Sequence, residues 1–276
     1  MTFPKLEALL ADWVKRSFHA FGEFVQKTLV ITEIEARKIR HDPKQLLTRA
    51  AQPIVWLGIF GQVFSRFEAI PTGDFSYLDY ITPGIVGQSL LFLTIFSGLV
   101  ILSERDLGLL QKLLVSPTPR LSLVIGKGVG NTLRTLVQSL IIYVLAIPLG
   151  VTLNWHFFAL IGVIVTILLA TVLFSTFSLL IVCMGKTQEG FLGIAQFLTL
   201  PVFFTSNAIY PLEMMPPWLQ TFALINPLTY TIDALRGLML VGEANSYPLL
   251  LNWGILLGFT LILAALGRWQ YPTLVN

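Results

Sequence analysis

The sequence predicts an all-α membrane protein with six transmembrane helices, an interfacial amphipathic helix at the N-terminus, and short re-entrant helices before the last span. Hydrophobic residues make up 55% of the 276 residues and charged residues only 12%, whereas a soluble domain carries about a quarter charged residues. Six long apolar runs follow one another along the chain, and an apolar stretch broken by prolines separates the last two. This composition and spacing are typical of a chain that is folded in lipid.

The six apolar runs are candidates for helices that cross a bilayer, for which about 20 residues are needed. They are Ala51–Phe67, Tyr80–Leu102, Gly128–Gly150, Phe157–Met184, Phe191–Ala208 and Leu249–Gly267. Pro201 interrupts the fifth run, and a kinked helix is admissible there if neighbouring helices satisfy the freed carbonyl. Residues 51–267 therefore form the predicted transmembrane domain.

The first 50 residues predict two cytoplasmic helices. In Lys5–Lys27 apolar residues recur at three- and four-residue spacing, which predicts a helix lying on the inner leaflet. The charged stretch Glu33–Arg40 predicts a connecting helix that stops near Asp42-Pro43. This second helix is either a solvated anchor or a docking surface for a cytoplasmic subunit, and the sequence leaves both interpretations open.

Lysine and arginine are concentrated in residues 1–50 and in the loop after the second run. Because positively charged loops stay in the cytoplasm, we expect both termini, including the tail 268–276, to be cytoplasmic. The net charge of +3 and the isoelectric point of about 9.0 follow from this bias. They give no support for a nucleic-acid partner.

Residues 103–127 form the predicted cytoplasmic segment between the second and third runs. Ser103–Asp106 ends the second run, the leucines of Leu107–Val115 predict a short amphipathic helix, and Ser116–Pro119 stops it. Connections between packed helices usually take about 2–8 residues. The greater length here predicts a rigid projection, with an extended solvated turn as the alternative.

Residues 209–248 form the predicted outer segment. Pro217–Ile225 and Leu228–Val241 are apolar but too short to cross, so we expect them to dip into the membrane and turn back. Asp233 and Arg236 stand at positions i and i+3 of one short helix, and we expect them to pair and stabilise the turn. The alternative is an exposed surface pair.

Ionisable side chains are scarce within the predicted spans. Arg134 lies inside the third run, and we expect its long side chain to snorkel to the cytoplasmic interface. The absence of carboxylates from the runs disfavours a proton-coupled antiporter. The remaining polar groups are amides and hydroxyls among aromatic residues, which suits an amphipathic substrate. His19, His41 and His156 are scattered, so no metal site is expected.

The sequence carries no complete nucleotide-binding motif. Gly185-Lys186-Thr187 is similar to the end of a phosphate-binding loop, but Leu180 stands where that motif requires glycine. The tripeptide also joins two apolar runs, whereas a phosphate-binding loop follows a strand. We therefore expect no catalytic residue, cofactor site or metal site on this chain.

Three ordered blocks carry a resemblance to a known family. They are Tyr80–Gly84 (YITPG), Glu104–Lys127 (ERDLGLLQKLLVSPTPRLSLVIGK) and Tyr210–Arg236, with its Asn-Pro-Leu-Thr-Tyr motif and terminal arginine. Together they resemble the integral-membrane permeases of type-2 ABC transporters, the class that includes daunorubicin-resistance and nodulation-factor exporters. The family's arginine-glycine pair stands here as Arg105 and Gly108, with altered spacing.

The resemblance implies one half of a transporter: a permease with six spans that forms a homodimer with a second copy. A separate ABC ATPase subunit, present in two copies, would bind beneath the permeases and carry ATP and Mg. The resemblance makes Leu107–Val115 the coupling helix that takes up ATPase motion, with these residues at the contact: Glu104, Arg105, Leu110, Leu113 and Arg120.

The resemblance also places the substrate path between the second and fifth spans. Its candidates are Gln88, Phe92, Phe96, Gln196, Thr199 and Phe203, and plain helix packing is the alternative role for each. The candidates in the outer segment are Tyr210, Pro211, Asn226, Pro227, Asp233 and Arg236.

These observations predict a non-enzymatic permease of the plasma (inner) membrane that exports a drug-like or lipid-like molecule and is driven by ATP hydrolysis on its partner. A glycolipid or polysaccharide exporter is the alternative in the same class. An ATP-independent channel, a secondary transporter and a structural membrane anchor are alternatives from other classes.

Overall fold

The computed structural model describes Glu33, Arg37 and residues 51–67, 70, 72–73, 75–107, 120–185, 187–242 and 245–270. For residues 67, 120–127 and 267–270 it describes the backbone only. Within these ranges the chain is helical and forms no strand apart from one isolated bridge between Leu153 and Leu240. The predicted all-helical fold class is thus confirmed for the described part of the chain.

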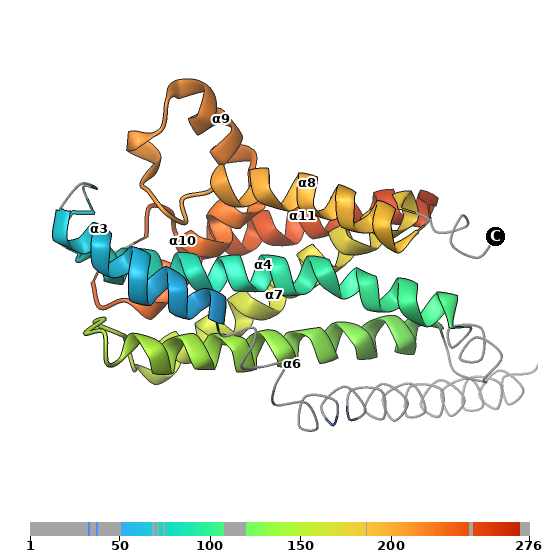
Figure 1. Cartoon of the computed structure of the whole chain (residues 1–276), viewed down its shortest axis with the longest axis horizontal. Helices are drawn as coiled ribbons and strands as arrows, with labels where there is room; N and C mark the ends of the chain where they lie inside the picture. The colour runs from blue at the N-terminus through green and yellow to red at the C-terminus, as the bar shows by residue number, and fades with distance from the viewer. Residues whose placement is uncertain are drawn as a thin grey trace, which may run out of the picture.

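In the described ranges, ten helical elements follow residues 51–55, which are themselves helical, and Figure 1 labels the α-helices among them. They are η1 (Trp56–Gly61, a π-helix), α3 (Gln62–Phe67), α4 (Tyr77–Asp106), α6 (Arg120–Ala146), α7 (Phe157–Met184), α8 (Gln188–Phe204), η2 (Leu212–Met214, a 3-10 helix), α9 (Pro217–Ile225), α10 (Pro227–Met239) and α11 (Leu249–Gln270).

Helical structure covers most of every predicted apolar run. Four stretches within the described residues are long and apolar enough to cross a membrane, namely Tyr77–Asp106, Gly128–Ala146, Phe157–Met184 and Leu249–Leu266. Helix α8 has 17 residues, which corresponds to about 25 Å against a hydrocarbon core of about 30 Å. Four candidate spans are therefore established by length and composition, and the six-span topology stays a prediction.

The N-terminal prediction falls almost entirely outside the described residues. Glu33 and Arg37 are both helical and exposed, and Arg37 Nη2 lies 2.7 Å from Glu33 Oε1. This contact fits the predicted connecting helix at that point. The amphipathic helix Lys5–Lys27 lies outside the described part of the chain.

Helices α4, α6 and α8 begin earlier than their apolar runs, α8 by three residues. Helix α4 begins at Tyr77 because Ser76 and Asp79 form a capping box, in which Asp79 donates its backbone N–H to Ser76 Oγ at 3.1 Å and Ser76 donates its N–H to Asp79 Oδ2 at 3.2 Å. Helix α6 begins at Arg120 and ends at Ala146, four residues before the expected Gly150. The segment 103–127 therefore starts and finishes inside helices.

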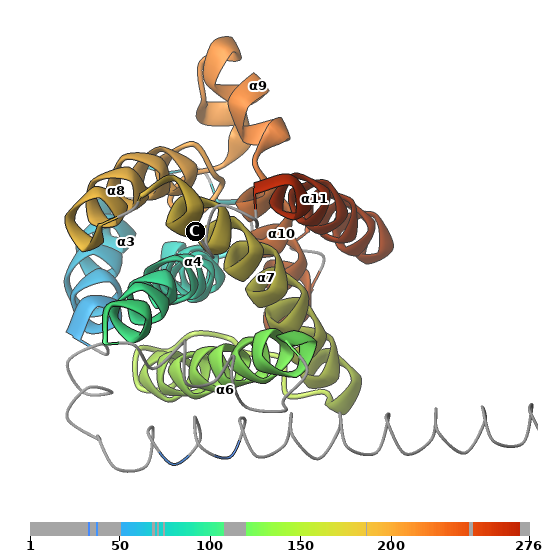
Figure 2. The same ribbon diagram turned by 90° about the vertical axis from the view of Figure 1, so that its right-hand side faces the viewer.

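Helix α4 is the central element of the bundle. It packs against η1, α3, α6, α7, α8 and α10, and the view along the bundle shows it enclosed by α3, α6, α7 and α8 (Figure 2). Its most apolar window is 61% buried, whereas that of α11 is 11% buried. Because α11 contacts mainly α7 and α10, it is the least buried of the four candidate spans.

The bundle is apolar outside and partly polar inside. Large apolar side chains such as Phe158 and Leu250 are exposed, while several buried threonines donate their hydroxyls to carbonyls one turn earlier. Thr94 Oγ1, for example, donates to Leu90 O at 2.6 Å. Such bonds satisfy a polar side chain without a partner from another helix, as a chain surrounded by lipid requires.

Glycines on α4 allow neighbouring elements to approach its backbone. A Cβ added at Gly98 would lie 2.5 Å from Ser178 Oγ and within 3.0 Å of the Phe191 ring. A Cβ added at Gly84 would collide with the carbonyl oxygen of Ala208, just past the end of α8. Gly84 therefore stands where the chain after α8 crosses α4 at backbone contact.

We predict that Gly84→Ala lowers the free energy of unfolding by about 1–3 kcal/mol, because rigid backbone must move to admit the methyl group. The control is Gly128→Ala on α6, where nothing lies within 4 Å of the new Cβ. That control should be neutral or stabilising by up to about 1 kcal/mol, from helix propensity. Thermal unfolding in detergent compares them, and equal midpoints for the two variants would contradict the close contact.

Candidate functional site

Two polar clusters lie at opposite ends of α4, and a cavity lies between them. The Asp106 end is where α4 finishes and α8 begins; the Asp233 end is where α4 begins and α10 packs against it. Figure 1 shows the helices running lengthwise between these two ends, with α3 and α9 at one of them. Several of the candidate functional residues lie at one of these three places.

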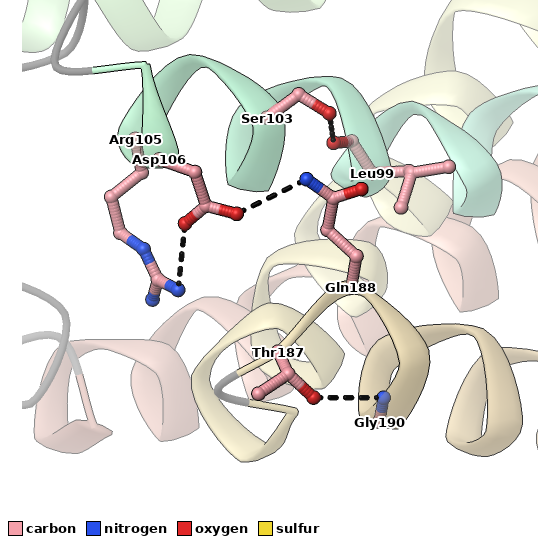
Figure 3. Close-up of polar contacts among 7 residues, drawn as sticks. All are labelled: Leu99, Ser103, Arg105, Asp106, Thr187, Gln188 and Gly190. Atoms are coloured by element: carbon pink, nitrogen blue, oxygen red, sulfur yellow. Dashed lines mark hydrogen bonds and ion pairs between the residues drawn. The ribbon is translucent and has the colours of Figure 1, made fainter.

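At the Asp106 end, one carboxylate joins α4 to the start of α8 (Figure 3). Asp106 Oδ1 lies 3.3 Å from Arg105 Nη2, and Asp106 Oδ2 accepts a hydrogen bond of 3.1 Å from Gln188 Nε2. Ser103 Oγ donates to Leu99 O at 2.9 Å within the last turns of α4. The hydrogen bond between Asp106 and Gln188 links the end of α4 to the start of α8.

The predicted coupling residues border this cluster. Glu104 and Arg105 are half-buried on α4 immediately before Asp106. Arg120 begins α6, with only its backbone described, and Leu110 and Leu113 lie outside the described residues. The predicted helix Leu107–Val115, except for its first residue, is likewise outside them.

The tripeptide that is similar to a phosphate-binding loop has a structural role at two of its positions. Thr187 Oγ1 accepts the backbone N–H of Gly190 at 3.1 Å and so caps the start of α8 (Figure 3). A Cβ added at Gly185 would lie 2.7 Å from the backbone nitrogen of Phe191. The geometry of the turn between α7 and α8 therefore explains why residue 185 is glycine and residue 187 is threonine.

A cavity of about 340 Å³ opens between α4 and α6 and reaches Gln52 in the first helical stretch. Its volume lies near the lower end of the range for ligand pockets, about 300–1,000 Å³. Aromatic, hydroxyl, amide and guanidinium groups meet in its lining, which consists of Gln52, Ser89, Phe92, Leu93, Phe96, Ser97, Val100, Arg134 and Gln138.

Of the six predicted path residues, the structure brings two to this cavity. Phe92 and Phe96 line it, and Phe203 packs edge-on against Phe92 with ring centroids 6.4 Å apart. Gln88 and Thr199 are buried, and their side-chain oxygens find no hydrogen-bond partner within the described structure. Gln196 is exposed on α8. The six residues therefore do not converge on a single cavity in this chain.

Arg134 lines the cavity between α4 and α6. It is half-buried and is the seventh residue of the candidate span Gly128–Ala146, and its snorkelling to the cytoplasmic interface stays a prediction. Gln138, one helical turn further along, lines it too. The sequence correctly identified Arg134 as the one charge well inside an apolar run. Hydropathy alone could not show which face of α6 packs toward α4.

At the Asp233 end, Asp233 is fully buried and holds the connection before α11. Its carboxylate accepts the backbone N–H groups of Ser246 at 2.7 Å and Tyr247 at 3.0 Å, and the side-chain amide of Asn252 at 2.9 Å. Asp233 thus fixes the entry into α11.

Arg236 is buried one turn further along α10 and contacts the start of α4 and the segment after α8. Its guanidinium lies over the ring of Tyr80, 3.8 Å from the centroid, and donates to Asn207 O at 2.9 Å. The expected ion pair between Asp233 and Arg236 is not formed, because Asp233 binds the segment before α11 and Arg236 binds Tyr80 and Asn207. The expected exposed alternative is also wrong, since both residues are buried.

The remaining outer candidates organise the turns around α10. Asn226 accepts the N–H of Leu228 at 2.9 Å and donates to Val202 O at 2.6 Å, linking the start of α10 to α8. Pro227 is the first residue of α10, a position that needs no N–H donor. Tyr210 donates its hydroxyl to Phe204 O at 2.6 Å. Pro211 lines a second cavity of about 190 Å³, beside Arg236.

Helices α9 and α10 occupy the two predicted re-entrant stretches but behave differently. Helix α10 packs against α4, α7 and α11, whereas α9 stands away from the bundle (Figures 1 and 2). Burial raises the pKa of Tyr230 on α10, with Tyr247 and Asp233 adding to the increase. Its hydroxyl stays protonated at neutral pH and donates to Leu224 O at 2.7 Å, joining the two helices.

Asp79 is a polar anchor that the sequence reasoning missed. It is 5% exposed, and its Oδ1 accepts the backbone N–H of Thr152 at 2.7 Å, which ties the loop before α7 to the start of α4. The Ser76-x-x-Asp79 spacing, a capping signal, could have identified it. No group of three or more metal-ligating side chains converges within the described residues.

Helices of membrane-spanning length around a mixed polar and aromatic cavity define a helical membrane protein suited to transport. The sequence profile of the family described as ABC-2 type transporter matches residues 26–240. The chain therefore belongs to the ABC-2 type transporter family, which confirms the resemblance drawn from its three sequence blocks.

Named relatives are transport permeases. The transport permease ycf38 of Cyanophora paradoxa is 30% identical over 217 residues, covering 78% of this chain and 74% of that protein. The inner membrane transport permease YadH of Escherichia coli is 25% identical over 240 residues, covering 84% and 90%. The daunorubicin resistance ABC transporter permease protein DrrB1 of Streptomyces coeruleorubidus is 24% identical over 200 residues, covering 72% and 70%.

We predict that Asp233→Ala and Arg236→Ala destabilise the fold independently, because their hydrogen-bond partners differ. Each change removes a buried charged group and strands its partners, so each should lower the free energy of unfolding by about 2–4 kcal/mol. In the double variant the two losses should add to within about 1 kcal/mol. A double-mutant cycle on unfolding in nanodiscs measures this. A double variant more stable than Arg236→Ala alone would restore the ion-pair interpretation.

Proposed function

We propose that this chain is the permease subunit of an ATP-driven exporter that moves a hydrophobic or amphipathic molecule, drug-like or lipid-like, out of the cytoplasm or inner leaflet. The observation that carries the proposal is the cavity beside α4, in which Phe92 and Phe96 face Arg134 and Gln138. Apolar and polar surfaces of this kind match the two parts of an amphiphile. The name of the relative DrrB1, a daunorubicin resistance permease, agrees with a drug-like or lipid-like substrate.

ATP hydrolysis would take place on a separate subunit, bound in two copies to a permease dimer. The sequence motif that most resembles a phosphate-binding loop is accounted for by the α7–α8 turn, which leaves nucleotide chemistry to a partner. The ABC-2 family membership of the chain supports an ABC ATPase as that partner, with ATP and Mg bound there.

In the proposed topology all six helical runs cross the bilayer, both termini are cytoplasmic, and the membrane is the plasma (inner) membrane. The Asp106 end then faces the cytoplasm, next to the Lys- and Arg-rich segments. The Asp233 end faces outward, where α9 and α10 would form the re-entrant segment. Short α8 is accommodated by local thinning of the bilayer, at a modest cost.

Coupling in this proposal runs along α4. The segment 107–119 would contact the ATPase, so its displacement pulls on the end of α4. Asp106 and Gln188 pass the displacement to α8, while α4 itself carries Phe92 and Phe96 in the cavity wall. A displacement of segment 107–119 would therefore change the shape of the cavity and the packing of α4 against α8 together.

Topology is tested with single cysteines in a background where Cys183 is replaced by alanine. A cysteine at His156, exposed before α7 at the Asp233 end, should react with an impermeant maleimide added to intact cells. A cysteine at Glu189, exposed at the Asp106 end, should react only after the membrane is permeabilised. Labelling of Glu189→Cys from outside would contradict the proposed orientation.

The function is tested on the tagged permease purified from its native membranes into nanodiscs. We expect an ATPase to co-purify and to hydrolyse ATP at least about threefold faster in the presence of one of three amphiphiles: daunorubicin, lysophosphatidylglycerol or lysophosphatidylcholine. Asp106→Ala combined with Gln188→Ala should reduce this stimulation, because the hydrogen bond between the end of α4 and the start of α8 is lost.

Glu189→Gln is the matched control, since Glu189 is an exposed carboxylate next to Gln188. This control should keep the full stimulation. Purification without any ATP hydrolysis, or hydrolysis that none of the amphiphiles changes, would overturn the exporter assignment and favour a channel.

A further inference from the structure

The cavity between α4 and α6 has an apolar wall and a polar wall. Phe92 and Phe96 lie one turn apart on α4, and their rings are stacked with centroids 6.1 Å apart. Arg134 and Gln138 lie one turn apart on α6 and face the same space. An aromatic surface therefore stands opposite a cation and an amide.

The two walls are joined at one side by a hydrogen bond. Ser97 Oγ on α4 accepts from Asn131 Nδ2 on α6 at 2.9 Å, and it donates to Thr94 O at 2.7 Å. Asn131 lies almost one turn before Arg134, so this bond fixes the spacing of α4 and α6 next to the guanidinium. The cavity is thus bordered by helices held at a defined separation.

The cation lies within a candidate membrane span. Arg134 is the seventh residue of the span Gly128–Ala146. A positive charge at that depth opposes insertion and is found mainly where it faces a cavity or a partner. In such a low-dielectric place its attraction for a negative group is also stronger than in water.

We propose that this cavity binds the negatively charged headgroup of a membrane amphiphile, and that Arg134 selects the negative charge. A guanidinium presents several N–H donors in a planar fork that fits phosphate or carboxylate oxygens. Arg134 can therefore bind a headgroup oxygen in addition to the contacts it makes within the protein. Gln138 offers an amide beside it, and Phe92 and Phe96 contact the apolar part next to the headgroup.

The size of the cavity indicates how much of the molecule it takes. A volume of about 340 Å³ is near the lower limit for ligand pockets, so it holds a headgroup and the first part of a chain. The rest of a long acyl chain must remain among lipid and outward-facing apolar side chains. This inference rests on the proposed function, because it names the substrate class that the permease would accept.

The test compares two probes with the same acyl chain, palmitoyl lysophosphatidylglycerol and palmitoyl lysophosphatidylcholine. Native mass spectrometry of the full-length permease, released from a nonionic detergent, measures the dissociation constant of each. We expect the anionic probe to bind about tenfold more tightly to the wild type, as one charge-assisted hydrogen bond allows. Arg134→Gln should bring the ratio near one, and Arg134→Lys should retain most of it.

Further variants separate charge selection from folding. Arg66→Gln removes an exposed arginine on α3 that is not part of the cavity lining, and should leave the tenfold ratio unchanged. Phe96→Ala should weaken both probes alike, because it removes part of the apolar wall. The thermal midpoint of each variant confirms that it is folded.

Three results would overturn the inference: an unchanged preference in Arg134→Gln, no preference in the wild type, or inorganic phosphate alone binding as tightly as the anionic probe. The last result would indicate a soluble anion as the ligand. The binding measurement needs no ATPase, so its failure would leave ATP coupling intact, whereas loss of ATP coupling would leave the binding preference intact.

Discussion

The bilayer core offers no hydrogen bonds, so the polar groups inside this bundle depend on partners from the protein itself. Buried threonines bond to carbonyls of their own helix, and Asp79, Asp233 and Arg236 each hold a different connection at one end. These contacts position α4 between its six neighbouring elements. Helix α4 also carries the aromatic wall of the cavity and ends at Asp106. The need to pair polar groups within the protein therefore fixes the position of the helix that joins the cavity to both polar ends.

Much of the helical architecture could be predicted from the lengths of the apolar runs, because a helix in contact with lipid needs a long and continuously apolar sequence. Phe157–Met184 coincides with α7, and Pro217–Ile225 with α9. Helix starts were less accurate where polar residues extend a helix beyond its apolar run. Ser76 and Asp79 begin α4 before Tyr80, and α6 starts at Arg120 within a segment expected to be cytoplasmic. Capping and helix ends depend on local hydrogen bonds, which hydropathy does not record.

The candidate site was predictable as a set of residue types and less so as an arrangement. Phe92 and Phe96 line a cavity as expected of an aromatic path, but their polar counterparts come from α6, since only tertiary packing decides which face of α6 meets α4. The pairing of Asp233 with Arg236 failed for a related reason. Spacing of i and i+3 makes such a pair possible, yet the loop before α11 and the ring of Tyr80 offered each charge a closer partner.

The central claim is that α4 transmits events at the Asp106 end to the cavity. Its most direct test is the rate at which a maleimide labels Phe96→Cys, in a background lacking Cys183, with and without ATP bound to the co-purified ATPase. Our account predicts a change of at least about threefold on ATP binding, reduced by Asp106→Ala with Gln188→Ala, and no change at Phe197→Cys, which is 75% exposed on α8. An identical labelling rate of Phe96→Cys in both nucleotide states would contradict it.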